Sequence, residues 1–207
     1  MENNKVSGLT SQVIKHKLPL RIVQNCHITL NNVVVDESQK LPKATDFAKG
    51  TNAILKHSRI LVCWIAAGIC LGVYDNAIKF VSERRQFDRP ISGIFLFILG
   101  FQLIQEKMVK IMANTQAVYL MCYRLSKLAE EGNITIGQIA MFKAWATERT
   151  REVAKWGREV YGGNGIIHSN YVMKALADAE AIYTYEGTYD INTLVAGREL
   201  TGISAFK

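Results

Sequence analysis

The stretch FAKGTNAILKHSRILVCWIAAGICLGVYDNAIKFVSERRQF, residues 47–87, decides the fold of this chain. Its apolar residues recur every three or four positions, which is the period of an amphipathic helix. The pattern predicts a single long helix here. The residues expected on its inward stripe are Ile60, Trp64, Ala67, Leu71, Tyr74 and Ile78.

The same spacing predicts further helices downstream. The second covers about 101–131, and Thr135 is expected to be the N-cap of a third that runs to Val160. A shorter helix is expected over 170–178 and a last one over 188–200. Long helices joined by short links pack antiparallel, so the expected fold class is mainly α, an antiparallel helical bundle. The inward residues expected in the second helix are Leu103, Met108, Ile111, Met112 and Ala117.

Residues 6–42 have a different pattern, because apolar and polar residues alternate and β-branched side chains are frequent. Short strands separated by turns are expected over 12–14, 20–23, 27–30 and 33–35. So few strands do not form a stable sheet alone. We therefore interpret residues 1–44 as the remnant of a larger β-domain and residues 45–207 as the helical bundle domain.

Composition excludes a disordered chain, because 49% of the 207 residues are hydrophobic and 21% are charged. The net charge of +7 makes a polyanion a candidate partner. The densest basic spots, at 83–85 and 149–151, are interrupted by acids or hydroxyls, so a solvated helix face is favoured over a nucleic-acid groove. A few arginines would also suit a phosphorylated small ligand. The cysteines and histidines lack the spacing of metal ligands, so no metal site is expected.

No membrane span is expected, because the most apolar run, residues 94–99, is far shorter than the roughly 20 residues that a span needs. The first residues, MENNKV, contain no apolar signal core. The last residues, SAFK, differ from a peroxisomal S-K-L ending. No targeting segment is therefore expected in this chain.

Three short clusters could carry chemistry: ERRQF (83–87), YGGNG (161–165) and YEGTYD (185–190). Each has an ordinary structural explanation. Basic residues are favourable at the C-terminal end of a helix, paired glycines are typical of a C-cap, and an acid is favourable beside a helix N-terminus. Judged one at a time, the clusters indicate helix ends.

Taken together and in order, the clusters belong to a longer series of phrases. These are LRIVQN (20–25), RRQF (84–87), FQLIQEK (101–107), GGNGI (162–166), YTYEGTYDI (183–191), GRE (197–199) and TGI (201–203). The series resembles the C-terminal part of the acyl-CoA dehydrogenase and acyl-CoA oxidase family over nearly the whole chain. Within that family, glutaryl-CoA dehydrogenases and the short-chain acyl-CoA oxidases of plant peroxisomes are most similar.

The resemblance implies FAD-dependent α,β-desaturation of a short-chain acyl-CoA in fatty acid β-oxidation. Glu186 matches the family's catalytic base, and Arg59, Tyr185 and Gly187 match residues that bind the acyl-CoA substrate. The α-proton beside a thioester is weakly acidic, so the base needs a dry pocket and the developing enolate needs hydrogen-bond donors. In the family, these donors are the backbone N–H of the base and a ribityl hydroxyl of the flavin.

The resemblance also implies how FAD is bound and how the chain assembles. Thr188 and Asp190 match residues that meet the flavin beside the base. The residues matched to the FAD of a neighbouring subunit are Arg84, Gln86, Phe87, Gln102, Glu159, Gly162 and Gly163. A homo-oligomer, either a dimer or a tetramer, is therefore expected, with acyl-CoA as its substrate and no nucleic acid. The resemblance places the protein in the peroxisome; because this chain has no peroxisomal signal at its end, the cytoplasm is the other expected location.

The chain departs from the family in three places. The family's N-terminal helical domain and most of its middle β-domain are missing here, including the strands that hydrogen-bond the flavin ring, so little or no turnover is expected from this chain alone. Residues 91–100 (ISGIFLFILG) stand where the family has a short link. A hydrophobic lid, a membrane-touching loop and a gene-model artefact are the alternatives for them. Asp88 replaces a glycine that is usual in the family.

Two other classes of function are alternatives to the enzyme. A non-catalytic assembly module would pair through its helical bundle with full-length subunits. A nucleic-acid binder would use the basic charge of the chain. For an enzyme, oxidase and dehydrogenase activity are both compatible with these residues, and so are acyl chains of different lengths.

Overall fold

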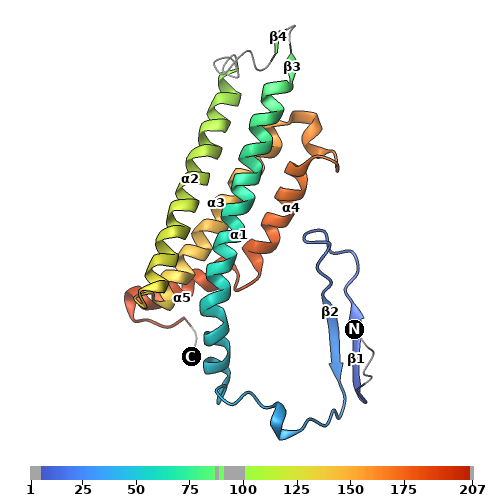
Figure 1. Ribbon diagram of the computed structural model, residues 1–207, viewed down its shortest axis with the longest axis vertical. Coiled ribbons are helices and arrows are strands. Elements are labelled where there is room, and N and C mark those ends of the chain that lie inside the picture. The colour runs from blue at the N-terminus through green and yellow to red at the C-terminus, as the bar shows by residue number, and fades with distance from the viewer. Residues whose placement is uncertain (1–5, 87–88, 91–100, 206–207) are drawn as a thin grey trace.

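The computed structural model describes residues 6–86, 89–90 and 101–205, which form an antiparallel helical bundle with a β-hairpin beside it (Figure 1). Phe87, Asp88 and the interposed residues 91–100 lie outside the described residues. The expected fold class, mainly α with a small β remnant ahead of the bundle, is confirmed. The helices are α1 (Phe47–Glu83), α2 (Gln102–Glu130), α3 (Ile136–Val160), α4 (Tyr171–Thr184) and α5 (Tyr189–Thr201).

Helix α3 is central to the bundle, because it contacts α1, α2, α4 and α5. It begins where the sequence predicts. Thr135 Oγ1 accepts from Gln138 N at 3.1 Å, and Gln138 Oε1 accepts from Thr135 N at 3.1 Å. This capping box satisfies two N–H groups that have no partner within the helix. Glu199 of α5 accepts from the Gly137 amide at 2.7 Å and from the Thr135 hydroxyl, which ties α5 to the start of α3.

Two helix ends differ from the expected ones. Helix α1 ends at Glu83 and not near residue 87, and Arg85–Gln86 (β3) pairs with Arg89–Pro90 (β4) instead. The residues just after Glu83 are exposed, so no packing holds them in a helix. Helix α4 continues to Thr184, well past residue 178, because the buried side chain of Ile182 extends its core face.

The core-facing sides of α1 and α2 also differ from the expected stripes. Leu71, Leu103 and Met112 were predicted inward, but they are 45%, 72% and 50% exposed. A Cβ on Gly157 of α3 would overlap Val73 Cγ1, so α1 and α3 approach too closely for large side chains at the contact. The residues that α1 buries completely are therefore small, namely Cys63, Ala66, Cys70, Val73 and Ala77.

Helix α1 is the one described helix that is long and apolar enough to span a membrane. Its most apolar 18-residue window has a mean hydropathy of 1.7. A core helix passes the same test, and 39% of this window is buried inside the molecule. Helix α1 packs against α2, α3 and α4, so its place in the core accounts for part of this apolar composition.

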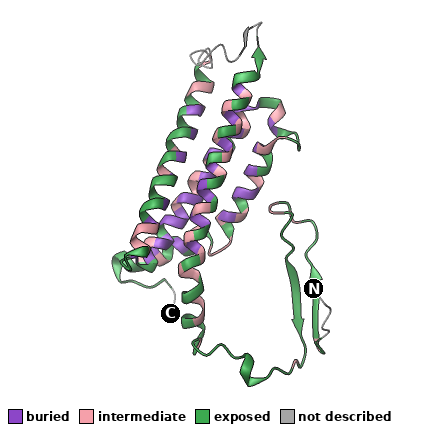
Figure 2. Cartoon of the chain, viewed as in Figure 1, coloured by how far each residue is buried: buried purple, intermediate pink, exposed green. Residues whose placement is uncertain are grey.

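The β-hairpin pairs β1 (Leu9–Val13) with β2 (Cys26–Leu30), and a short 3-10 helix, η1 (Glu37–Gln39), lies between it and the bundle. All residues of both strands are exposed (Figure 2). In the loop of the hairpin, Leu20 N donates to Asp178 Oδ1 of α4 at 2.7 Å. The strands predicted over 20–23 and 33–35 are wrong, because no described strand pairs with either segment. The boundary at residue 44 stays a prediction.

Candidate functional site

The turn between α4 and α5 presents Glu186, the predicted base, in a left-handed backbone conformation. The φ of Glu186 is +57° and that of Gly187 is +86°. A residue other than glycine in this region costs about 1–2 kcal/mol, and it persists only where the surrounding structure enforces it. Side chains from α1, α3 and α5 do so.

Helix α1 contributes two neighbouring residues to the turn. Ser58 Oγ donates to Glu186 Oε2 at 2.6 Å, and Arg59 Nε donates to the Glu186 carbonyl at 3.1 Å. Arg59 is only 7% exposed. Burial lowers the pKa of its guanidinium, and the charge of Glu186 opposes this shift. The structure therefore brings together the predicted base and the predicted substrate-binding arginine.

Helices α3 and α5 contribute a fully buried lysine and a fully buried asparagine. Lys143 Nζ donates to the Gly187 carbonyl at 2.6 Å and to the Tyr183 carbonyl at 3.3 Å. Asn192 Nδ2 donates to the Gly187 carbonyl at 2.7 Å and to the Thr188 carbonyl at 3.0 Å. Burial lowers the pKa of Lys143 to about 8. The carbonyls of the turn are thus held by buried donors from three helices.

Gly187 has to be glycine for these donors to fit. A Cβ there would lie 2.8 Å from Asn192 Nδ2 and 3.3 Å from Arg59 Nη2. Its φ of +86° is also one that side-chain-bearing residues rarely adopt. A side chain at this position would therefore separate the turn from the donors that hold it.

The remaining predicted residues of this cluster flank the turn. Tyr185 is half-buried against the core, and burial raises the pKa of its phenol. Thr188 Oγ1 accepts from Ile191 N at 3.3 Å and so caps α5, while Asp190 lies in the first turn of that helix. Thr188 and Asp190 are exposed beside Glu186, so both are accessible to a ligand at this surface.

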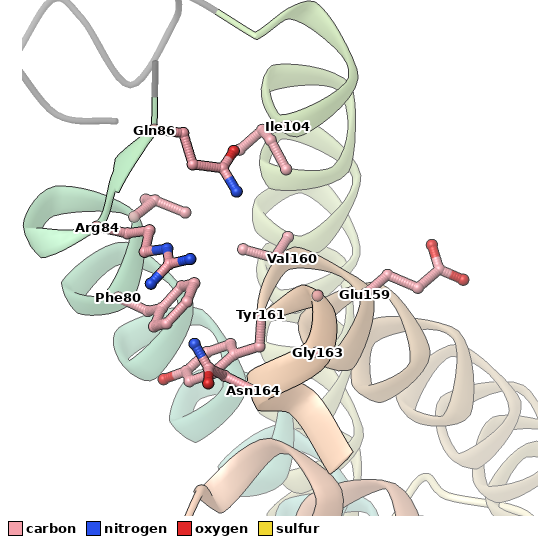
Figure 3. Close-up of a pocket in the computed structure, with 11 residues that line it drawn as sticks. Phe80, Arg84, Gln86, Ile104, Glu159, Val160, Tyr161, Gly163 and Asn164 are labelled. Carbon is pink, nitrogen blue, oxygen red and sulfur yellow. The ribbon is translucent and has the colours of Figure 1, made fainter. Parts of the chain in front are cut away.

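The second predicted cluster lines a cavity of about 290 Å³ at the other end of α1 (Figure 3). The cavity lies between this end of α1, the start of α2 and the junction of α3 with the 3-10 helix η4 (Gly162–Ile166). Phe80 stacks on Tyr161 in it, with ring centroids 3.9 Å apart. The predicted cofactor residues that line it are Arg84, Gln86, Glu159, Gly162 and Gly163.

Among the predicted cofactor residues, Gln102 does not line the cavity, and Glu159 lines it without directing its carboxylate inward. Gln102 is exposed in the first turn of α2, and Ile104 lines the cavity instead. The Glu159 carboxylate points away from the Arg84 side of the cavity (Figure 3) and lies 3.5 Å from Lys107 Nζ. Phe87 lies outside the described residues, so its role stays a prediction.

The lining of this cavity fits the phosphate and adenine part of FAD. Gly162 has a φ of +56°, and the space where its Cβ would stand is open, as it is at Gly163. A ligand can therefore approach the backbone closely there. Arg84 supplies a planar cation suited to phosphate, and Gln86 supplies an amide (Figure 3). The residues present thus fit one part of the cofactor.

The two clusters are too far apart to contact the same atoms of a ligand within one chain. Arg59 and Arg84 are both on or next to α1, 25 positions apart in the sequence. At about 1.5 Å per residue, this separation is roughly 37 Å along the helix. One copy of the chain therefore presents two separate sites.

Sequence reasoning missed three residues that contact the Glu186 turn, Ser58, Lys143 and Asn192, and one residue beside Arg59, namely Arg198. Lys143 and Asn192 could have been found from the sequence. Each is a polar residue four positions from a buried apolar residue, Ile139 or Ala196, and therefore lies on the buried face of its helix. Arg198 lines a cavity of about 390 Å³ together with Arg59, and it belongs to the phrase GRE.

Residues 49–201 match the family described as acyl-CoA dehydrogenase, C-terminal domain. This chain belongs to that family. Within the family it is similar to a glutaryl-CoA dehydrogenase from Desulfococcus multivorans, with 27% identity over 175 residues, which is 84% of this chain and 43% of the relative. The predicted family and the predicted likeness to glutaryl-CoA dehydrogenases are confirmed.

Two solved glutaryl-CoA dehydrogenase structures from Mycobacterium smegmatis share the fold. One has a TM-score of 0.89 at 30% identity, and the other, in complex with FADH2, has a TM-score of 0.89 at 26% identity. Each alignment covers 98% of this chain and 50% of the solved chain. The chain thus spans about half the length of these relatives.

Proposed function

We propose that this chain carries the base-bearing half of an FAD-dependent site for α,β-desaturation of a short-chain acyl-CoA. The observation that carries the proposal is the Glu186 turn. Its carboxylate lies on a left-handed backbone whose carbonyls are held by Arg59, Lys143 and Asn192. Such preorganisation suits a base that must meet one proton of a bound substrate.

Bound FAD would supply the hydride acceptor for the β-hydrogen of the substrate. The residues of this chain supply the other functions. Glu186 removes the α-proton with a carboxylate oxygen. Ser58 holds Oε2, so Oε1 is the oxygen left to take that proton. The backbone N–H of Glu186 donates to the thioester carbonyl, as the family resemblance implies, and Arg59 fixes the carbonyl of the same residue.

A working site requires more than one copy of this half. The cavity lined by Arg84, Gln86 and Gly162, here called the Arg84 cavity, lies roughly 37 Å along α1 from Arg59. It therefore serves a different FAD from the one that meets Glu186. In this proposal, each copy offers its base to one FAD and its Arg84 cavity to the FAD of a neighbour. The assembly is therefore a homo-oligomer, a dimer or a tetramer.

The substrate class, the electron acceptor and the location are further parts of the proposal. The relatives named above are glutaryl-CoA dehydrogenases, which supports a short acyl chain. The likeness of the sequence to plant short-chain oxidases favours oxygen as the acceptor and the peroxisome as the location. Reoxidation by an electron-transferring flavoprotein, and a cytoplasmic location, are the competing alternatives.

The role of Arg84 is tested by a matched pair of arginine variants. Arg84→Ala should weaken binding of FAD to the purified chain about tenfold, because a hydrogen bond to a charged group contributes about 1.5 kcal/mol or more. Arg85→Ala should leave it unchanged, because Arg85 is exposed and does not line the cavity. Flavin fluorescence anisotropy measures both. Equal weakening by the two variants would mean that only net charge matters.

The role of Glu186 is tested in a chimaera that joins this chain to the uncovered half of the Mycobacterium smegmatis glutaryl-CoA dehydrogenase. We expect a yellow protein whose flavin absorbance is bleached by a short-chain acyl-CoA. Glu186→Gln should keep the colour and slow bleaching at least a hundredfold, which is the contribution of a positioned base. Glu131→Gln, an exposed control, should not slow it.

The 207-residue chain alone should show little or no turnover. Purified chain that is yellow by itself and bleached by an acyl-CoA would contradict this expectation. It would also show that the residues described above hold a complete flavin site.

A non-catalytic assembly module is the second candidate function. It is favoured by the outward face of α2, where Leu103, Val109 and Leu120 are 72%, 58% and 54% exposed. Apolar residues exposed along one helix are typical of an interface. Size-exclusion chromatography of the chain with a full-length acyl-CoA dehydrogenase distinguishes the candidates. Stable mixed oligomers, together with an inactive chimaera, would favour the assembly module.

A further inference from the structure

Lys143 of α3 is a completely buried cation that forms no ion pair with any described residue. Lys143 Nζ instead donates to two backbone carbonyls, those of Gly187 at 2.6 Å and Tyr183 at 3.3 Å. Burying an ammonium group without a carboxylate partner is unfavourable. A lysine in this position therefore performs a task that an apolar residue of the same size could not.

The two carbonyls lie on either side of Glu186 in the sequence. Tyr183 belongs to the last turn of α4, and Gly187 is the residue directly after Glu186. A single ammonium group that bonds both carbonyls closes the ends of the segment that carries the carboxylate. Arg59 and Asn192 act differently, because neither bonds a carbonyl that precedes Glu186. Arg59 bonds the carbonyl of Glu186 itself, and Asn192 bonds the carbonyls of Glu186, Gly187 and Thr188.

We propose that Lys143 is a positioning residue for Glu186, and that its bridge between Tyr183 and Gly187 sets the direction in which the carboxylate points. This inference rests on the proposed function, in which Glu186 is the base. Lys143 does not touch the ligand in this proposal. It acts by keeping Glu186 in the left-handed conformation that lets Ser58 Oγ reach the carboxylate.

The charged and titratable groups that face Lys143 are few. Helix α1 presents Arg59 and the thiol of Cys63, and the turn presents Glu186. Burial is the main cause that lowers the pKa of Lys143 to about 8, and Arg59 lowers it further. Burial raises the pKa of the Cys63 thiol well above its ordinary range, and arginine stays protonated. We therefore expect Lys143 to lose its charge near pH 8.

The experiment observes the Glu186 turn by NMR in the full 207-residue chain, without flavin or substrate. The backbone carbonyl carbons of Tyr183 and Gly187 and the side-chain carboxyl carbon of Glu186 are observed between pH 6 and 10. In the wild type, the Tyr183 and Gly187 carbonyl resonances should titrate together near pH 8, because their shared donor loses its charge. Titration of one carbonyl without the other would show that they share no donor and would overturn the proposal. If neither titrates, Lys143 keeps its charge up to pH 10, and the variants below decide.

Three variants separate positioning from packing. Lys143→Met keeps the buried stem but removes the donor, so the titration should be lost and the Glu186 carboxyl resonance should shift. Lys143→Gln keeps a neutral donor, so the Glu186 resonance should return toward the wild-type position while the titration stays lost. Lys155→Met removes an exposed lysine from the same helix and should change neither.

The variants can also contradict the proposed role of Lys143. If Lys143→Met folds, as judged by circular dichroism, and leaves the Glu186 resonance unmoved, Lys143 only fills space and the proposal is wrong. If the variant does not fold, the wild-type titration and Lys143→Gln decide the question. An inactive chimaera with an intact Lys143 titration would instead reject Glu186 as the base, while the bridge itself would stand.

Discussion

The buried ammonium of Lys143 makes the stability of the fold depend on pH. The pKa of Lys143 is lowered from 10.5 to about 8 in the folded chain, because burial disfavours the charged form. Between these values, the unfolded chain holds a proton that the folded chain has released. The free energy of unfolding should therefore rise with pH in this window, by at most about 1.4 kcal/mol per pH unit from this residue.

This pH dependence is measured as a difference between two proteins. Urea unfolding of the wild type and of Lys143→Met from pH 7 to 11 gives the stability difference at each pH. The wild type should gain on the variant from about pH 8 upward and level off above the unfolded pKa of 10.5. A difference that is constant over this range would show that Lys143 has an ordinary pKa in the folded chain.

At the same residue scale, the sequence identified some members of the Glu186 cluster and not others. Glu186 and Gly187 are found from a phrase of adjacent letters, and Arg59 follows from the same resemblance. Ser58 and Lys143 could not be found in this way. They meet the turn across 128 and 44 positions of sequence, so their role depends on how α1 and α3 pack.

At the scale of elements, glycines allow the helices to approach closely. A Cβ on Gly157 of α3 would overlap Val73 Cγ1 of α1, and a Cβ on Gly72 of α1 would lie 2.7 Å from Tyr171 Oη of α4. Gly68 of α1 has no heavy atom within 4 Å of the place where its Cβ would stand. Gly157 and Gly72 thus permit close contacts between helices, whereas Gly68 leaves open space.

Two glycine variants should therefore change stability in opposite directions. Gly157→Ala should lower the free energy of unfolding by about 1–3 kcal/mol, because the added methyl group overpacks the α1–α3 contact. Gly68→Ala should raise it by about 1 kcal/mol, because alanine favours the helix and meets open space. Chemical unfolding of both variants checks this. Destabilisation by both would mean that residue 68 faces a partner in solution.

Sequence patterns predicted the helices more accurately than their buried faces. The capping box at Thr135 and Gln138 is local, so it could be recognised from residues three positions apart. The inward side of α1 could not, because α2, α3 and α4 all pack on it and no single stripe is buried. Leu71 was misassigned for this reason.

At the scale of the whole molecule, the β-hairpin and the bundle are nearly independent. All residues of β1 and β2 are exposed, and the contact from the Leu20 amide to Asp178 Oδ1 links their loop to α4. The core clusters of the described residues are built from α1 to α4 and the segment around Ile134. The free energy of unfolding of the bundle should therefore owe little to the hairpin.

Removal of residues 1–44 tests this independence. The shortened chain should keep its helical circular dichroism and its unfolding free energy to within about 1 kcal/mol, the contribution of one hydrogen bond. A chain that loses its helical structure on removal of the hairpin would contradict the expectation. It would also place the domain boundary before residue 44.

The sequence by itself determined the helices, the capping box and the phrases that mark the family, because these features arise from residues close together in the chain. Tertiary structure decided which side chains surround Glu186. Ser58, Lys143 and Asn192 come from three helices, and they meet only when the bundle packs. Hydrogen bonds act over about 3 Å, so a site made of such contacts exists only once the helices are brought together.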